Sequence, residues 1–329
     1  MRSLILAADV GATNMRVGLF SEKGELLRVK LGKTPQTQTH ETVPRALLNL
    51  AKDVAGSEWS SIKSCGVASI GPLDSKRGVI LKAPNIAEKG RDIPLLAGLT
   101  KELDVDYYFL NDCNAAAYGE WWAVKEGGVK NLIYITISSG IGGGVVDNRH
   151  LILGKQGNGA EIGHIVIDAT GYMDCGCGGL GHWEAYCSGA NIPRLAAKLL
   201  HDDRLERGTG LERSIEIGAL DAKQCFELYY AGDPAAKRLF EFLKDCYAAG
   251  LTSVINAFDA EVLVLGGAIY LRNEDFFNSE VIPRIDKFLL LDKPRISKPV
   301  YGDLAPLYGA ALCARDEIEG ARVTSPLSW

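Results

Sequence analysis

The segment from Gly159 to Gly189 constrains the fold more than any other part of the sequence, because it concentrates side chains that bind metal ions. Thiols and imidazoles in the spacing C-x-C-x4-H, with another histidine eleven residues upstream, suit a tetrahedral Zn²⁺ ion. The candidate ligands are His164, Cys175, Cys177 and His182. The alternative is that the two cysteines are ordinary small residues of a glycine-rich loop.

The number of candidate ligands indicates what the metal does. A catalytic zinc ion usually has three protein ligands and keeps one position open for water. Four candidates therefore favour a closed, structural site. Such an ion does no chemistry, but it fixes the loop so that Glu161, His164 and Glu184 face a shared pocket.

Composition and charge exclude several classes of protein. With 329 residues, 47% of them hydrophobic, the chain can bury a large core and is expected to form two domains. A net charge of -5 gives no attraction to nucleic acid or to an anionic membrane. Eight scattered cysteines suit a reducing cytoplasm. The first residues predict a buried strand that meets Asp9 rather than a signal peptide, and no apolar run reaches the ~20 residues of a membrane span.

Two segments far apart in the chain share a strand–turn–strand pattern. Apolar runs flank a turn of small residues at 9–14 and again at 138–144, which predicts a duplicated architecture with phosphates held between the two turns. Gly11 and the Thr13 hydroxyl can offer hydrogen bonds to a phosphate, and Asp9 beside them can hold Mg²⁺. The alternative for each segment is a plain hairpin turn.

Asp112 is the candidate catalytic residue. The expected strand 106–110 runs into Asn111 and Asp112, and a helix is expected at 115–124. A carboxylate at the end of a strand can accept a proton from an attacking hydroxyl. The alternative is that Asp112 caps the helix, although Asn114 can take that role instead.

Further elements follow from periodicity and glycine positions. Helices are expected at 42–54 and 304–314, and residues 320–329 are expected to form a loose tail. A strand at 260–265 precedes Gly266 and Gly267, where a nucleotide can lie against the backbone. The alternative for the two glycines is a tight turn from strand to helix.

Five motifs in order resemble the ROK family (repressor, open reading frame, kinase) of sugar kinases, in the superfamily of actin, hexokinase and the heat-shock ATPases. They are DVGATNMRVGLF, FLNDCNAAAYGE, SSGIGGGVV, GAEIGH with CGCGGLGHWE, and VLVLGGAI, and the resemblance covers Leu4 to Ala314. It implies a two-lobed, ribonuclease H-like α/β fold with an inter-domain cleft. The small lobe would comprise 1–112, completed by about 304–329, and the large lobe 113–303 with the zinc loop.

The resemblance also implies roles for single residues. Asp112 would be the general base, and Asp9 would lie near the Mg²⁺ ion. The sugar would contact Gly71, Asn85, Asn111, Asp112, Glu161, His164 and Glu184, and the nucleotide would contact Asp9, Gly11, Thr13, Asn14, Thr136, Gly140, Gly266 and Gly267. His182 stands where the family usually has a third cysteine, and Cys187 or Asp174 could take its place as a ligand.

The implied activity is ATP-dependent phosphorylation of a hexose, most simply glucose, at the 6-hydroxyl, with ATP, Mg²⁺ and structural Zn²⁺. N-acetylhexosamine kinases and fructokinases are the alternative enzymes, since the pocket for the sugar C2 group cannot be read from the sequence. A sugar-sensing regulator or a sugar-binding module is the alternative outside the enzymes. Because the resemblance begins at Leu4, we expect the chain to lack the N-terminal DNA-binding domain of the regulators. The resemblance further implies a cytoplasmic homodimer or homotetramer.

Overall fold

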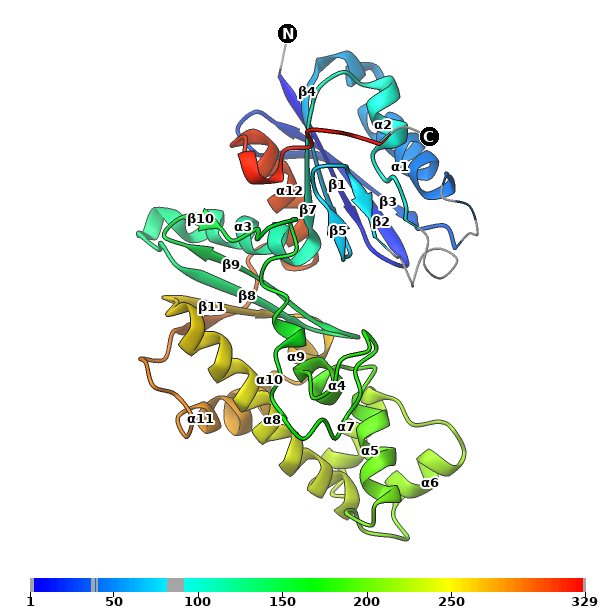
Figure 1. Cartoon of the computed structure of the whole chain (residues 1–329), viewed down its shortest axis with the longest axis vertical. Helices are drawn as coiled ribbons and strands as arrows, with labels where there is room; N and C mark the ends of the chain where they lie inside the picture. Colours follow the sequence, from blue (N-terminus) through cyan, green and yellow to red (C-terminus); the bar gives the residue numbers. More distant parts are fainter. Residues whose placement is uncertain (1–2, 37–38, 40, 82–91, 328–329) are drawn as a thin grey trace. The chain divides into compact units, whose positions relative to one another are not determined.

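A computed structural model describes residues 3–36, 39, 41–81 and 92–327 (Figure 1). The chain forms two compact units. Unit 1 comprises Met1–Tyr134, Gly144–Ala160 and Pro299–Trp329, and unit 2 comprises Ile135–Gly143 and Glu161–Lys298. The lobes expected from the resemblance, 1–112 with 304–329 and 113–303, stay a prediction.

The first sheet has five strands in the order β3-β2-β1-β4-β7. An antiparallel meander forms one side of it, and β4 and β7 extend it in parallel to β1. Every residue of β1 is buried, which explains why its sequence is a continuous apolar run rather than an alternating one. The strands are β1 Leu4–Val10, β2 Asn14–Ser21, β3 Leu26–Lys33, β4 Ile62–Ser69 and β7 Asp106–Asn111, and β5 Leu73–Asp74 pairs separately with β6 Val79–Ile80.

Helices cover the first sheet. The predicted helix at 42–54 is confirmed as α1, whose residues Val43, Leu47 and Val54 are buried in the core of unit 1. α12 contacts β1, β2, β4 and β7, and it also packs along α3. Figure 1 shows α12 and α1 lying against the strands. The helices of unit 1 are α1 Thr42–Ala55, α2 Ala97–Glu102, α3 Asp112–Val124 and α12 Ala305–Arg315, with short helices η1 Gly56–Ser61, η2 Lys125–Gly127, η5 Gly302–Leu304 and η6 Glu319–Ala321.

The second sheet repeats the strand order of the first. Its order is β10-β9-β8-β11-β12, so a meander again precedes two added strands, and the predicted duplication is confirmed. The turn between β8 and β9 occupies the same place as the turn between β1 and β2. The strands are β8 Leu132–Ile137, β9 Ile141–Asp147, β10 His150–Leu151, β11 Val262–Gly266 and β12 Arg295–Ser297.

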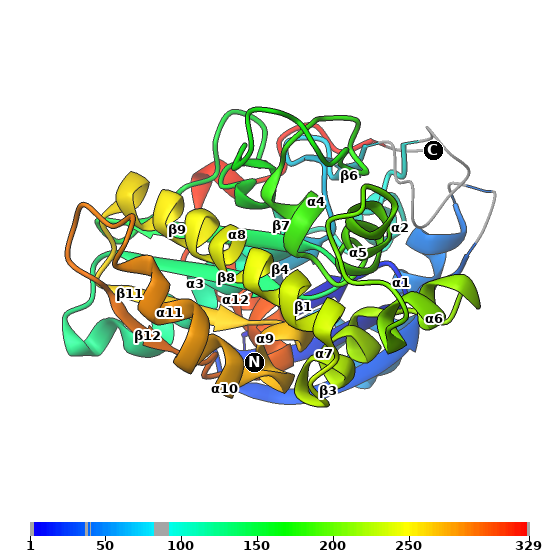
Figure 2. The same cartoon turned by 90° about the horizontal axis from the view of Figure 1, so that it is seen from below.

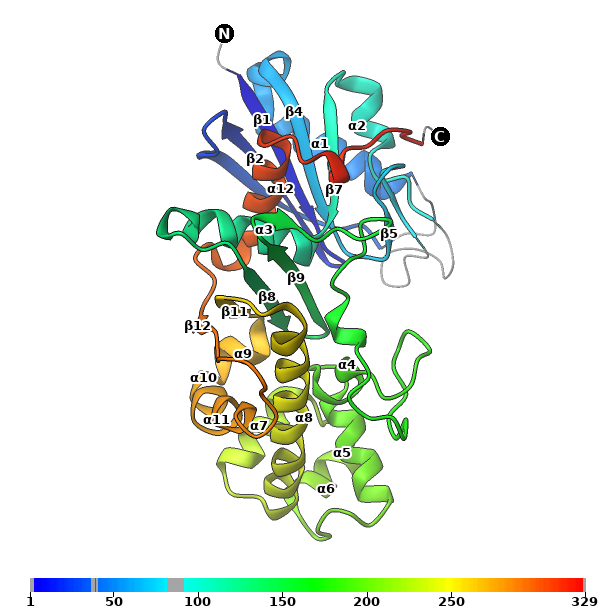
Figure 3. The same ribbon diagram turned by 60° about the vertical axis from the view of Figure 1, so that its left-hand side comes forward.

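Unit 2 is built around the long helix α8, Pro234–Phe258. Figure 2 shows its length, and Figure 3 shows α4 and α5 on one side of it and α10 and α11 on the other. Phe226, Phe240 and Phe276 pack edge to face where α7, α8 and α10 meet. The other helices are α4 Trp183–Cys187, α5 Ile192–His201, α6 Gly210–Glu216, α7 Ala222–Tyr230, α9 Ala268–Arg272, α10 Glu274–Phe276 and α11 Ile282–Ile285, with η3 Ile162–His164 and η4 Phe277–Val281.

The C-terminal segment differs from the expected loose tail. Val323 donates its backbone N–H to the Tyr107 carbonyl at 2.8 Å, and Thr324 donates to the Lys76 carbonyl at 3.0 Å. The expectation was wrong for the described part because polar residues can be held by backbone hydrogen bonds that leave no apolar pattern. Among the described residues, no helix is both long and apolar enough to cross a membrane.

Close packing of α12 against α3 leaves no room for a side chain at Gly309. A Cβ atom at Gly309 would lie 1.7 Å from the Ala115 carbonyl oxygen of α3, whereas a Cβ at Gly127 would meet no atom within 4 Å. We expect Gly309→Ala to lower the free energy of unfolding by about 1–3 kcal/mol through overpacking, despite the helix propensity of alanine. Urea titration followed by circular dichroism measures it. Gly127→Ala is the control, and equal stability of the two variants would contradict the prediction.

Candidate active site

The predicted site residues of unit 1 gather at one edge of the first sheet. Val10 at the end of β1 pairs with Ser69 at the end of β4, and Ser69 pairs with Asn111 at the end of β7. The carboxyl ends of parallel strands are where open α/β sheets bind ligands. This register therefore puts the turn after Asp9 and the candidate base Asp112 on the same edge. Gly71 follows β4 there, and the predicted Asn85 lies outside the described residues.

The first turn is held by strand β3. Gly11 donates its N–H to the Asn14 carbonyl at 2.9 Å, which closes the turn. Thr34 donates its hydroxyl to the Gly11 carbonyl at 2.7 Å and its N–H to the Thr13 carbonyl at 3.0 Å. Lys33 donates its ammonium to the Asn14 Oδ1 at 2.9 Å. Lys33 was missed at the sequence level, because only the pairing of β2 with β3 brings it to this turn.

Asp9 lies beside an arginine. Its carboxylate accepts a hydrogen bond from Arg16 at 3.0 Å, and its side chain is 10% exposed. Burial raises the pKa of Asp9, and the Arg16 guanidinium acts in the opposite direction. The Mg²⁺ role of Asp9 stays a prediction.

Asp112 occupies the first turn of α3, which begins three residues earlier than expected. Asn111 caps the helix by accepting hydrogen bonds from the N–H groups of Cys113 at 2.8 Å and Asn114 at 3.4 Å. The interpretation of Asn114 as the cap was wrong. Its amide donates instead to the carbonyls of Gly157 and Gly159, at 3.4 and 3.2 Å. Asn111 is the cap, and the Asp112 Oδ1 also accepts the Cys113 N–H at 2.8 Å.

The second turn, in unit 2, is supported by Glu184. One carboxylate oxygen of Glu184 accepts the Ile141 N–H at 2.9 Å, directly after the turn. A Cβ atom at Gly140 would lie 2.7 Å from that oxygen, so glycine allows the close approach. Thr136 lies at the end of β8, half-buried, just before the turn.

Glu161, His164 and Glu184, the three predicted sugar contacts of unit 2, lie close together. The His164 Nε2 is 4.0 Å from a Glu161 carboxylate oxygen. The side chain of Glu161 is 44% exposed. Burial by nearby protein atoms raises the pKa of Glu161, the His164 imidazole lowers it, and the Glu184 carboxylate raises it. Two carboxylates and an imidazole in this arrangement can accept and donate hydrogen bonds to several hydroxyl groups of one ligand.

The four predicted metal ligands come together in unit 2. His164 Nδ1 lies 3.3 Å from His182 Nδ1 and 3.7 Å from Cys175 Sγ, and Cys177 Sγ lies 3.3 Å from His182 Nδ1. All four donor atoms lie within 4.8 Å of one another. Zinc bonds of ~2.0–2.1 Å to nitrogen and ~2.3 Å to sulfur, at tetrahedral angles, separate neighbouring donors by about 3.3–3.8 Å. The donor set and its spacing fit Zn²⁺.

Backbone pairing produces this cluster. A bridge between Val166 and His182 places the two histidines side by side, and a second bridge between Asp174 and Leu180 closes the cysteine turn. The alternative ligands have other partners. Cys187 is fully buried and hydrogen-bonds to Cys246, and Asp174 forms an ion pair with Arg194 at 2.8 Å.

A slot of about 540 Å³ lies between α7 and α9 in unit 2, next to the glycines at the end of β11. Gly267 has a φ of +87°, and a Cβ there would lie 2.4 Å from the Ile137 carbonyl oxygen, so glycine is required. At the floor of the slot, Gly189 donates its N–H to the Ser138 carbonyl of the second turn at 2.7 Å. Phe226 and Tyr230 line the slot and were read from the sequence only as part of a helix.

Comparison with known proteins places this arrangement in a family. The model of the ROK family matches residues 5–317. The chain belongs to the ROK family. It is 34% identical over 312 residues to a glucokinase of Pyrobaculum calidifontis, covering 94% of each chain. It is 36% identical over 303 residues to a glucokinase of Aeropyrum pernix, covering 89% of each.

Solved structures agree with this assignment. The ROK hexokinase from Thermus thermophilus superposes with a TM-score of 0.79 at 31% identity, covering 97% of this chain and 99% of that one. A ROK glucokinase from Streptomyces griseus, solved with glucose and AMPPNP, gives a TM-score of 0.73 at 27% identity and covers 95% and 100%. The α/β fold of actin-like ATPases, predicted from the sequence, is confirmed.

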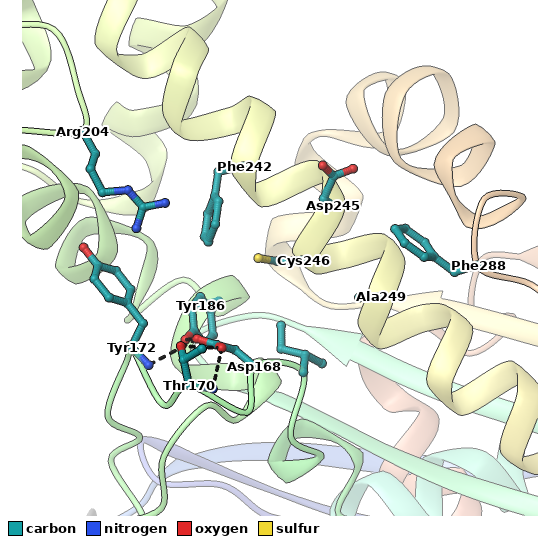
Figure 4. A pocket seen from close by; sticks show the side chains of 11 residues that line it. Asp168, Thr170, Tyr172, Tyr186, Arg204, Phe242, Asp245, Cys246, Ala249 and Phe288 are labelled. Atoms are coloured by element: carbon teal, nitrogen blue, oxygen red, sulfur yellow. Dashed lines mark hydrogen bonds between the residues drawn. The ribbon is translucent and has the colours of Figure 1, made fainter.

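The segment that leads from His164 to the cysteines of this ROK chain is fixed by Asp168. Its carboxylate accepts hydrogen bonds from the Thr170 hydroxyl at 2.6 Å, the Thr170 N–H at 2.9 Å and the Tyr172 N–H at 3.2 Å. Tyr186 of α4 donates its hydroxyl to the same carboxylate (Figure 4). The Thr170 and Tyr186 hydroxyls lower the pKa of Asp168 to about 2. The carboxylate thus ties the loop to the helix that carries Glu184.

This network predicts how stability depends on pH. The folded pKa of Asp168 is below its ordinary value of 3.8, so its contribution is present above pH 3.8 and is lost as the pH falls toward about 2. We expect Asp168→Asn to melt below the wild type at pH 7, and the difference to shrink toward zero as the pH approaches 2. Calorimetry across this range measures it. Asp147→Asn, at an exposed position, is the control, and a constant difference would contradict the prediction.

Proposed function

We propose that this chain is a glucokinase, which transfers the terminal phosphoryl group of ATP to the 6-hydroxyl of glucose. The observation that carries the proposal is the full-length similarity to glucokinases at 34% and 36% identity. The register that puts Asp112 and the first phosphate turn on one edge of the first sheet supports it. N-acetylmannosamine kinases are less similar, at 28% identity for the enzyme of Haemophilus influenzae.

In the proposed mechanism, Asp112 accepts the proton of the 6-hydroxyl as it attacks the phosphorus. The residues proposed to hold the other hydroxyl groups are Gly71, Asn85, Asn111, Glu161, His164 and Glu184. The cap bond of Asn111 uses only its Oδ1, which leaves the amide donors for the sugar. Glu184 keeps one oxygen on the second turn. Its helix therefore links sugar binding to the position of the phosphate turn.

The residues proposed to contact the phosphates of ATP are Gly11, Thr13, Asn14, Thr136 and Gly140. Gly266 and Gly267 are proposed to border the nucleoside. Mg²⁺ would neutralise phosphate charge near Asp9. Lys33 and Arg16, which lie beside the first turn, add positive charge that favours an anionic ligand.

The proposed metal is one structural Zn²⁺ ion held by His164, Cys175, Cys177 and His182. The Nδ1 atom of His164 belongs to the donor cluster, and its Nε2 is directed to Glu161. A carboxylate behind a ligating imidazole orients the ring. In this arrangement the ion supplies no chemistry, and it fixes the imidazole and carboxylate that meet the sugar.

The remaining proposals concern the sugar, the assembly and the location. Initial rates with glucose, mannose, fructose, N-acetylglucosamine and N-acetylmannosamine test the choice of glucose, since a buried hydrogen-bonding site discriminates strongly against a sugar lacking its partner.

We also propose a homodimer or homotetramer, tested by light scattering. The proposed location is the cytoplasm, where the eight free cysteines stay reduced.

Removing the proposed base should affect catalysis more than binding. We expect Asp112→Asn to lower kcat by about 10²–10⁴-fold, because the proton acceptor is lost, while glucose still binds. A coupled assay of ADP release and calorimetric titration with glucose measure both. Asp104→Asn, an exposed position before β7, is the control. A loss below tenfold in the folded variant would remove Asp112 from this role, and no ADP release from the wild type would favour a sugar-binding module.

Removing the metal should loosen the sugar site. We expect elemental analysis to find one zinc ion per chain, and chelation to lower the melting temperature and raise the KM for glucose. His182→Ala should reproduce both effects because it removes one donor of the cluster. His150→Ala, an exposed histidine outside the cluster, is the control. Unchanged melting and affinity after verified metal removal would show that the loop needs no metal.

A further inference from the structure

We propose that the phosphoryl donor site accepts purine nucleoside triphosphates as a class, including GTP and ITP, because the slot between α7 and α9 holds the base by its flat faces. This inference rests on the proposed kinase function and concerns the same nucleotide site. It depends on three observations: the walls of the slot, its connection to the second phosphate turn, and the positions of its polar side chains.

The slot has an apolar and aromatic patch among its lining residues. Phe226 and Tyr230 project from α7, and Ile269 lies opposite on α9. The ring of Tyr230 is 56% exposed although it belongs to a well-packed unit, while Phe226 beneath it is 3% exposed. The Tyr230 hydroxyl donates to the Asn273 Oδ1 at 3.3 Å, which links α7 to the residue after α9. An exposed ring held in this way is a ready stacking surface for a base.

The slot adjoins the second turn through Gly189. Gly189 lines the slot and donates its N–H to the Ser138 carbonyl, and Ala190 donates to the Ser139 carbonyl at 3.1 Å. Residues that meet the nucleoside and residues that meet the phosphates are thus bonded to each other within unit 2. A nucleoside in the slot would direct its phosphates toward this turn. The geometry therefore favours a nucleotide over an unrelated apolar ligand.

The polar side chains of the slot do not form a buried set of hydrogen-bonding groups that would distinguish the edge of one base from that of another. Both polar groups of the Asn273 side chain already form hydrogen bonds. Its amide donates to the Ile269 carbonyl at 2.8 Å, and its Oδ1 accepts from Tyr230. Asp221 accepts the Gln224 N–H at 2.7 Å as the cap of α7. The other charged side chains, Lys223, Glu227 and Arg272, are exposed, and the first two form an ion pair at 3.3 Å.

These observations set the expected selectivity. Adenine, guanine and hypoxanthine differ only in groups on the ring edge, and stacking is tolerant of such differences because every base has a π-face. A site that buries hydrogen-bonding partners rejects the wrong ligand by about 10⁴–10⁵-fold, whereas an apolar pocket discriminates far less. Smaller pyrimidine rings cover less of the slot and are expected to be poorer donors.

The test measures kcat/KM for the magnesium complexes of ATP, GTP, ITP, UTP and CTP at saturating glucose. We expect GTP and ITP to lie within about tenfold of ATP, as an apolar slot implies. Values for both more than 100-fold below ATP would overturn the inference while leaving the kinase proposal intact. Turnover with none of the five would reject both proposals, so the two failures are distinguishable.

Two variants at Tyr230 test the role of the ring. Tyr230→Ala should lower kcat/KM for ATP, GTP and ITP by a similar factor, about 5–150-fold, which corresponds to the loss of about 1–3 kcal/mol of stacking. Tyr230→Phe keeps the ring and loses only the bond to Asn273, so its kcat/KM should lie above that of Tyr230→Ala for all three nucleotides. A loss confined to one nucleotide would indicate a contact with the base edge and would overturn the inference.

Discussion

The pairing register of β1, β4 and β7 is the constraint on which the first half of the site depends. Val10, Ser69 and Asn111 are neighbours across the three strands, so the residues that follow them share one edge. A shift of one residue in any pair would turn the following side chains to the other face of the sheet. Burial of both faces of β1 makes such a shift costly. The apolar core thus fixes the distance between phosphate turn and base.

In unit 2, Glu184 connects three groups of residues that lie apart in the sequence. Its carboxylate holds the turn at Ile141, and its helix begins directly after His182 of the metal cluster. The same helix carries Tyr186, which bonds to Asp168 in the zinc loop. Moving this helix would disturb the four candidate metal ligands and the turn at Ile141 together. The loop therefore has several anchors, and the proposed metal is one of them.

The sequence predicted correctly those features that depend on a local pattern, and it missed those residues whose positions depend on tertiary pairing. The C-x-C-x4-H spacing together with the histidine upstream was sufficient to find the four clustered side chains, because short loops bring such residues together. The sequence offered Asp112 or Asn114 as the cap of α3, whereas the structure has Asn111, and the Asn114 amide donates to Gly157 and Gly159 instead. Lys33 and Tyr230 were missed because β-pairing and helix packing, rather than a motif, give them their positions.

The duplication explains why the two sheets have the same strand order, although different residues support the turn in each. Each sheet has a small-residue turn between its first two strands. In the first, the end of β3 locks this turn through Thr34. In the second, β10 is only two residues long, and the support comes from Glu184 in the long segment between β10 and β11. That segment also supplies the metal cluster and one wall of the nucleoside slot. Specialisation of the second repeat therefore lies in this insertion, which supports the turn beside the short strand β10 and carries the four candidate metal ligands.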